Sequence, residues 1–337
     1  MSNVELRKTA QALAVKGKGI LAADESAGTI AKRFETIGLA STEITRRDYR
    51  EFLFATDDLE RYISGVILYE ETLAQRSQSG LSLVEMLQKK NIIPGIKVDT
   101  GLVNLAGSQN EKVTQGLDGL EKRLESYKEM GALFAKWRAV FNIGDNKPSL
   151  LAVQTNAYLL ARYARICQDI GIVPIVEPEI LMTGEHSLQT CQLVSENILH
   201  EVFHALYAHG VLLEGIILKP SMVTPGEGAK VAASVTDVAI HTLEVLLRTV
   251  PAAVPSINFL SGGQTPMLST QHLNEMHVHL SQMPWNLSFS YGRALQAPSL
   301  EIWKGKSENI PAAQAALHQR AKLNSLACFG QYQVTME

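Results

Sequence analysis

The sequence predicts an α/β fold, a (β/α)₈ TIM barrel with N-terminal and C-terminal helical extensions, from three observations. Eight short apolar runs rich in β-branched residues recur along the 337 residues. Longer stretches with helical periodicity separate most of these runs, and no low-complexity linker divides the chain. We therefore expect residues 1–337 to form one barrel domain.

Each apolar run is short enough for a strand and ends near polar or turn residues. The predicted strands cover 19–24 (GILAAD), 63–71, 92–99, 133–140, 172–179, 214–220, 254–263 and 287–294. Clear helical patterns lie between them, for example at 150–171 and 231–250. Because a barrel takes about 250 residues, the surplus predicts an N-terminal helix over 3–16, longer loops and a helical segment over 311–330.

Composition excludes several classes of partner. The formal net charge is −3, the pI is near 6.3, and no basic tract stands out, which argues against nucleic acid or an acidic membrane surface as a partner. Neither a secretion signal nor an apolar run of membrane-spanning length is present in the sequence. The three scattered cysteines, Cys167, Cys191 and Cys328, predict free thiols in a cytoplasmic protein.

Charged residues end most of the predicted strands, on the face where a barrel carries its active site. They are Asp24, Lys97 with Asp99, Lys136 with Arg138, Glu177 with Glu179, Lys219, and Arg293. A strand also ends in a polar residue simply because it meets water there. Charges of both signs on so many successive strands favour a functional site.

Lys219 ends an apolar strand, and Pro220 follows it. A neutral lysine amine attacks a ketone and forms an iminium, which acts as an electron sink. Burial and a neighbouring cation both favour the neutral amine, and Lys136 on the strand two earlier is available as that cation. Glu177 lies on the strand between them and could relay protons. Alternatively, these charges with Glu179 form an ion-pair network that only holds the barrel rim together.

Two groups of residues are suited to phosphate. In 259–264 (FLSGGQ), Ser261, Gly262 and Gly263 offer a hydroxyl and backbone N–H groups, and in 290–294 (SYGRA) Ser290 and Gly292 precede Arg293. The simpler reading of the first segment is a plain glycine turn. The second group is expected across the barrel mouth and consists of Lys97 with Ser26, Thr29 and Arg33. Two anion sites suggest a substrate phosphorylated at both ends.

Seven segments together resemble the class I fructose-bisphosphate aldolase family, from about Lys18 to Cys328. They are GKGILAADES, PGIKVD, FAKWRAV, PIVEPEIL, LKPSMVTPG, FLSGGQ and FSYGRALQ. The resemblance implies a TIM barrel, usually a homotetramer, that needs no metal or cofactor. It also implies reversible cleavage of fructose 1,6-bisphosphate into dihydroxyacetone phosphate and glyceraldehyde 3-phosphate, in glycolysis and gluconeogenesis.

The resemblance also implies a role for each matching residue. Lys219 would be the Schiff-base lysine, Glu177 the main acid/base, Lys136 a proton-handling and charge-stabilising partner, and Asp24 the group acting on the C4 hydroxyl. The phosphate nearest the ketone would bind Ser261, Gly262, Ser290 and Arg293, and the far phosphate Ser26, Thr29, Arg33 and Lys97. Arg138 and Glu179 would line the site in supporting roles.

The sequence departs from the family pattern at three places. Thr100 stands where the family often has lysine, and TPMLST replaces an acidic stretch after the glycine turn. Many members also continue past the equivalent of CFGQYQVTME into a mobile tail whose last tyrosine reaches the active site. The preference between bisphosphate and monophosphate sugars is therefore left open.

Two rival hypotheses come from other features. HEVFH (200–204) matches the H-E-x-x-H zinc-protease motif, although so short a motif often occurs by chance; HVH (277–279) is weaker still. A barrel that only senses or scaffolds sugar phosphates is the non-enzymatic alternative. Such a binder would need the phosphate contacts but not the combination of Asp24, Lys136, Glu177 and Lys219.

Overall fold

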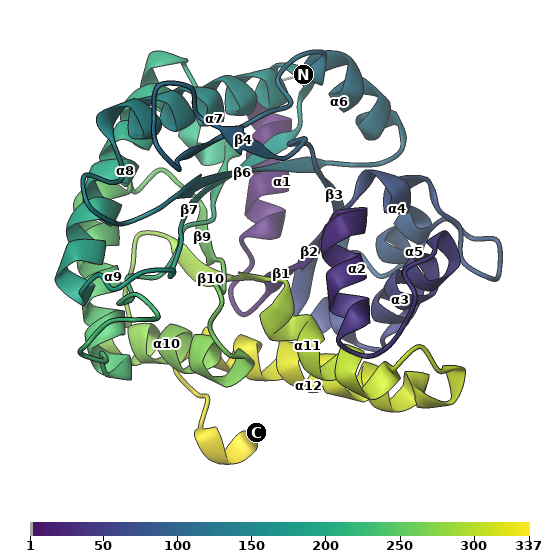
Figure 1. Cartoon of the computed structure of the whole chain (residues 1–337). Coiled ribbons are helices and arrows are strands. Elements are labelled where there is room, and N and C mark those ends of the chain that lie inside the picture. Colours follow the sequence, from purple (N-terminus) through teal and green to yellow (C-terminus); the bar gives the residue numbers. More distant parts are fainter. Residues whose placement is uncertain (1–2) are drawn as a thin grey trace.

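The computed structural model describes residues 3–337 and shows a closed barrel of eight parallel strands surrounded by helices (Figure 1). The strand order around the ring is β1-β10-β9-β8-β7-β6-β3-β2. The barrel strands are β1 (Gly19–Ala23), β2 (Ile63–Leu68), β3 (Ile93–Lys97), β6 (Phe134–Phe141), β7 (Val173–Ile180), β8 (Ile217–Leu218), β9 (Ser256–Phe259) and β10 (Asn286–Tyr291). All eight predicted strands and the barrel fold are confirmed.

Helices connect the strands and form the outer ring. They are α1 (Asn3–Leu13), α2 (Ala27–Glu35), α3 (Glu43–Ala55), α4 (Glu70–Ala74), α5 (Leu83–Lys89), α6 (Leu120–Glu129), α7 (Leu150–Ile170), α8 (Leu188–Ala208), α9 (Val235–Thr249), α10 (Pro266–His279), α11 (Arg293–Trp303) and α12 (Ile310–Ala327). Short 3₁₀ helices lie at Leu59–Arg61, Leu213–Gly215, Ser307–Asn309 and Val334–Met336. Within residues 3–337, none of the helices has the length and apolar character needed to cross a membrane.

Hydroxyl side chains fix where the long outer helices begin. Ser149, Ser187, Ser234 and Thr265 have extended backbones, and each side-chain oxygen accepts a hydrogen bond from the amide three residues later. Such caps satisfy amides that have no partner inside the helix. The start of each of these helices is therefore encoded in one residue of the preceding loop.

The N-terminal helix α1 closes one end of the barrel. Its buried residues Leu6, Ala10 and Leu13 pack against inward-facing residues of the strands, among them Phe134 and Ile175. Figure 1 shows α1 lying across the ring of strands. Burial of these apolar side chains stabilises the fold and confirms the N-terminal helix that the sequence predicts.

A two-stranded sheet in the loop after β3 is not among the predicted elements. Strands β4 (Leu102–Asn104) and β5 (Lys112–Thr114) pair antiparallel. The residues of β4 are exposed, so they carry no alternating apolar pattern from which a strand could be inferred. The C-terminal helical segment, by contrast, is confirmed by α12.

Candidate active site

An open cleft of about 870 Å³ lies at the carboxyl ends of the barrel strands. Every site residue that the sequence predicts lines it. They are Asp24, Ser26, Thr29, Arg33, Lys97, Lys136, Arg138, Glu177, Glu179, Lys219, Ser261, Gly262, Gly263, Ser290, Gly292 and Arg293. The fold thus brings together residues from all parts of the chain at the face where a barrel carries its active site.

Glu177 bridges two buried lysines in this cleft. Its Oε1 lies 3.2 Å from Nζ of Lys219, and its Oε2 lies 3.5 Å from Nζ of Lys136. Nζ of Lys136 also lies 2.7 Å from Oδ2 of Asp24. Lys136, Glu177 and Lys219 are each only 4% exposed. A carboxylate is therefore held between two amines at distances over which protons can pass.

The surroundings assign charges to Asp24 and Lys136. Burial raises the pKa of Asp24, but the charges of Lys136 and Lys219 outweigh it and bring that pKa to about 2. Burial lowers the pKa of Lys136, but Asp24 and Glu177 outweigh it and hold that pKa above its usual value. At neutral pH, Asp24 is a carboxylate paired with a charged Lys136.

Arg138 and Glu179 form a second ion pair, two residues further along β6 and β7. Burial lowers the pKa of Arg138, but Glu179 outweighs it and raises that pKa. The Arg138 side chain is 38% exposed, far more than the lysines. This pair lines the cleft nearer to solvent.

The loops after β9 and β10 form an anion-binding surface. Gly262 and Gly263 have φ values of 58° and 97°, which favour glycine. A Cβ atom added to Gly263 would lie 3.8 Å from Nη2 of Arg293, so the guanidinium stands beside the glycine loop. Ser290 is 1% exposed, and its hydroxyl has no partner among the described residues. Free N–H, O–H and guanidinium donors around one space suit a phosphate.

One expectation about the second cationic group is wrong. Strand β1 pairs directly with β10, as in Ile20↔Ser290, so the residues that follow β1 lie beside the Arg293 loop rather than across the mouth. Nη2 of Arg33 would lie 3.7 Å from a Cβ added to Gly292. Arg33 therefore adjoins the first phosphate group, and Ser26 and Thr29 follow the strand that pairs with β10, because the ring closes between strands one and eight.

Lys97 stands apart from those three residues. It ends β3, where its register partner on β6 is Lys136. Its ammonium donates to the carboxylate and to the carbonyl oxygen of Asp99, each at 2.7 Å. Strands β2 and β1 separate β3 from β10 in the ring. Lys97 is thus the member of the second group that lies across the barrel from Arg293.

Sequence reasoning missed the residues that hold Arg33. Arg33 pairs with Glu25, which is buried. Oε1 of Glu25 accepts from Nε2 of Gln296 at 2.9 Å, and its carbonyl accepts from Nη2 of the buried Arg50 at 2.7 Å. Gln296 in turn accepts from the hydroxyl of Tyr49 at 2.9 Å. Glu25 and Gln296 both lie within the family-like segments, and this was the only signal for them.

Comparison with known proteins identifies the family of this chain. Residues 5–337 match the family model for class I (glycolytic) fructose-bisphosphate aldolase. This chain belongs to the class I fructose-bisphosphate aldolase family. Membership makes it an aldolase, a carbon–carbon lyase, and metal independence is typical of class I. The sugar phosphates expected as its ligands agree with the two anion-binding regions of the cleft.

Relatives match this aldolase along almost their whole length. "Fructose-bisphosphate aldolase 6, cytosolic" of Arabidopsis thaliana is 55% identical, covering 97% of this chain and 91% of the relative. The "Probable fructose-bisphosphate aldolase class 1" of Xanthomonas campestris is 52% identical, covering 98% and 99%. A solved structure of the Plasmodium falciparum aldolase, in complex with TRAP and a small-molecule inhibitor, has a TM-score of 0.97, 51% identity and coverage of 98% and 95%.

The zinc-site hypothesis for HEVFH finds no support in the aldolase fold. His200 and His204 are exposed on α8, on the outside of the barrel (Figure 1). Across residues 3–337, no group of three or more His, Cys, Asp or Glu side chains is arranged to hold a metal ion. In the HVH segment, Nε2 of His277 lies 2.9 Å from the carbonyl of Leu287, so that ring serves the fold.

Proposed function

We propose that this chain cleaves fructose 1,6-bisphosphate reversibly into dihydroxyacetone phosphate and glyceraldehyde 3-phosphate, with Lys219 as the Schiff-base residue. The observation that carries this proposal is the placement of Glu177 between Lys219 and Lys136. Anion-binding groups flank these three residues in the same cleft. A rim network that served only stability would not require phosphate sites around it.

In the first half of the reaction, the neutral amine of Lys219 attacks the C2 ketone and forms a carbinolamine. Glu177, within 3.2 Å of the amine, takes up the proton that the Lys219 ammonium loses before it attacks, and then gives this proton to the C2 hydroxyl, which leaves as water, so that an iminium remains. The positive charge on Lys136 stabilises negative charge that develops beside the iminium.

In the second half, Asp24 accepts the proton of the C4 hydroxyl as the C3–C4 bond breaks. The electron pair of that bond moves into the iminium and forms an enamine, and glyceraldehyde 3-phosphate departs. Protonation of the enamine at C3 restores the iminium. Water then hydrolyses it, which releases dihydroxyacetone phosphate and the free Lys219 amine.

Phosphate recognition follows from the ring of strands. Lys219, directly after β8, places the ketone next to the loops after β9 and β10. The adjacent 1-phosphate would bind Ser261, Gly262, Gly263, Ser290, Gly292 and Arg293. Lys97 would hold the 6-phosphate, with Ser26, Thr29 and Arg33 along the wall between the two sites. Arg138 and Glu179 would line the sugar.

Borohydride reduction tests the central step. We expect reduction in the presence of dihydroxyacetone phosphate to attach the triose covalently to Lys219, as peptide mapping by mass spectrometry would show. Lys219→Arg, which keeps the charge but forms no stable iminium under these conditions, is the control. Label on Lys136 would reverse the assignment, and a complete lack of label would refute the Schiff-base mechanism.

We also propose a homotetramer of single-domain chains that acts in the cytoplasm, in glycolysis and gluconeogenesis. The relatives named cytosolic support the location. Large apolar side chains exposed on α7 and α8, among them Tyr158, Leu193 and Tyr207, support contact between subunits. Light scattering coupled to size exclusion would test the assembly, and a mass near that of one 36.9 kDa chain would refute it.

A further inference from the structure

Backbone pairing between β7 and the segment that follows β8 ends at Lys219, whereas on the β9 side the carbonyl of Pro220 still accepts from the amide of Leu260 at 3.1 Å. Strand β8 has only two residues. The amide of Lys219 still donates to the carbonyl of Val176 on β7, at 2.8 Å. Pro220 follows Lys219 directly, and on β7 Pro178 follows Glu177. Proline has no N–H, so neither residue can donate a hydrogen bond to extend the ladder between β7 and β8.

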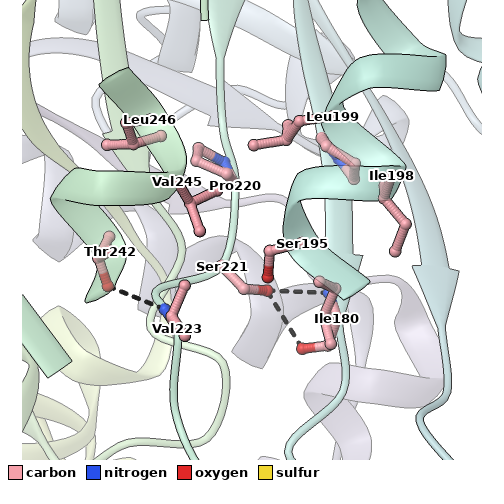
Figure 2. A pocket seen from close by; sticks show the side chains of 11 residues that line it. Ile180, Ser195, Ile198, Leu199, Pro220, Ser221, Val223, Thr242, Val245 and Leu246 are labelled. Carbon is pink, nitrogen blue, oxygen red and sulfur yellow. Dashed lines mark hydrogen bonds between the residues drawn. The ribbon is translucent and has the colours of Figure 1, made fainter. Parts of the chain in front are cut away.

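A side-chain hydroxyl joins the two segments where the backbone ladder between β7 and β8 stops. The hydroxyl of Ser221 accepts from the amide of Ile180 at 2.9 Å and donates to the carbonyl of Ile180 at 3.1 Å. Figure 2 shows both bonds, which join the segment after Lys219 to the end of β7. One hydroxyl, two residues past Lys219, thus joins the segment after β8 to the end of β7.

A second side chain fixes the same segment from the helical side. The hydroxyl of Thr242 on α9 accepts from the amide of Val223 at 2.9 Å (Figure 2). Thr242 is 1% exposed, so water does not compete freely for this bond. Together, Ser221 and Thr242 hold the chain at two points within four residues of Lys219.

The space around Ser221 is otherwise mostly apolar. It contains a cavity of about 10 Å³ walled by Ile198, Leu199, Val245 and Leu246. The hydroxyl of Ser195, which also lines this space, donates to the carbonyl of Cys191 in its own helix at 2.7 Å. Ser195 and Ser221 therefore share one pocket (Figure 2), but only Ser221 is bonded to the end of β7.

We infer that Ser221 is a positioning residue for Lys219. By joining the segment after β8 to Ile180, it keeps Nζ of Lys219 in register with Glu177, at 3.2 Å. Glu177 and Ile180 belong to the same strand, β7, so a bond to Ile180 aligns the lysine with its carboxylate partner. The inference rests on the proposed function, in which that pair forms and breaks the Schiff base.

The test compares two serine-to-alanine variants from the same pocket. Because a misplacement of about 1 Å costs about 10²-fold in rate, we expect Ser221→Ala to lower kcat by roughly 10- to 100-fold, with KM within about twofold. The single-turnover rate of borohydride trapping with dihydroxyacetone phosphate should fall by the same factor. Ser195→Ala, the control, should keep both rates within about twofold, and Ser221→Thr, which retains the hydroxyl, should recover most of the loss.

Thr242→Val provides an independent variant should Ser221→Ala fold poorly. It removes the bond to Val223 and should also lower kcat and the trapping rate rather than raise KM. Its control is Thr249→Val on the same helix, where the hydroxyl donates to the carbonyl of Val245 at 2.7 Å and has no link to β8. Selective loss in Thr242→Val would support positioning of Lys219 by this segment.

Two results would overturn the inference. One is wild-type kcat and trapping rate in a folded Ser221→Ala. The other is an equal loss in Ser195→Ala, which would trace the effect to packing of α8. Failure of the proposed function looks different, because the wild-type protein itself would then give no label on Lys219.

Discussion

The site holds Asp24 in its ionised form. Its carboxylate lies 2.7 Å from the Lys136 ammonium, and its pKa is about 2 against an ordinary value of 3.8. Since the folded-state pKa lies below the unfolded one, the ionised group stabilises the fold at pH values above about 4. That stabilisation is lost as the pH falls through about 4 toward about 2.

Acid unfolding should reveal this contribution. The shift of nearly two pKa units corresponds to about 2 kcal/mol. Between pH 5 and pH 2.5, we expect the free energy of unfolding of the wild type to fall by up to about that much more than that of Asp24→Asn, which has no carboxylate to protonate. Urea titrations at both pH values provide the measurement. Parallel losses in the two proteins would contradict it.

Glu177 contacts both lysines, and its proposed role is to transfer protons rather than to fill space. Glu177→Gln keeps the volume of the side chain but cannot carry protons. We expect kcat for cleavage to fall about 10²- to 10⁴-fold, with KM changed far less. Steady-state kinetics with fructose 1,6-bisphosphate would show this, and a kcat near that of the wild type would return Glu177 to a purely structural role.

At the scale of elements, the order of strands decides which end of the substrate each residue meets. Lys97 on β3 and Arg293 after β10 lie on different sides of the ring. A hydrogen bond to a charged group contributes about 1.5–3 kcal/mol, or roughly 10- to 150-fold. We expect Lys97→Ala to lower kcat/KM for fructose 1,6-bisphosphate by about that factor and to affect fructose 1-phosphate much less.

Arg293→Ala is the matched comparison for Lys97→Ala. It should weaken both sugars, because both carry the 1-phosphate. The measurement is kcat/KM for the two sugars with both variants. Equal losses for the two sugars in Lys97→Ala would mean that Lys97 serves the chemistry or the fold, for example through its bonds to Asp99.

The barrel strands and the charged residues at their ends were predictable, because each strand is a short apolar run in the sequence that ends near a charged residue. The exposed strand β4 was not, since no face of it is buried. Nor was the support of Arg33, because Arg50 and Gln296 are distant in sequence from Glu25 and meet it only in the folded chain. The side of the ring on which Ser26, Thr29 and Arg33 lie was not predictable from the order of strands along the chain, because closure of the barrel pairs β1 with β10.

For the whole molecule, the N-terminal helix is part of the barrel core. Leu13 is fully buried, and its Cδ2 would lie 2.7 Å from a Cβ added to Gly65 on β2. Helix and strand are thus packed so closely that a side chain at Gly65 would force Leu13 to move. The helix should therefore unfold together with the barrel.

Replacing Leu13 should weaken the entire fold. We expect Leu13→Ala to lower the free energy of unfolding by about 2–5 kcal/mol, whereas Val4→Ala, at a residue 54% exposed on the same helix, should change it by less than about 0.5 kcal/mol. Urea unfolding followed by circular dichroism and by tryptophan fluorescence should give coincident transitions. Two separate transitions would contradict a single domain.

Closure of the barrel by α1 also determines the route by which molecules enter and leave the cleft. The end opposite the cleft is filled by Leu6, Ala10 and Leu13. Substrate and products therefore enter and leave through the same opening. In the proposed mechanism, the triose joined to Lys219 lies at the inner end of that passage and cannot leave while the bond lasts. Glyceraldehyde 3-phosphate, which carries no such link, departs first, and the enzyme is empty again only after dihydroxyacetone phosphate has followed it out.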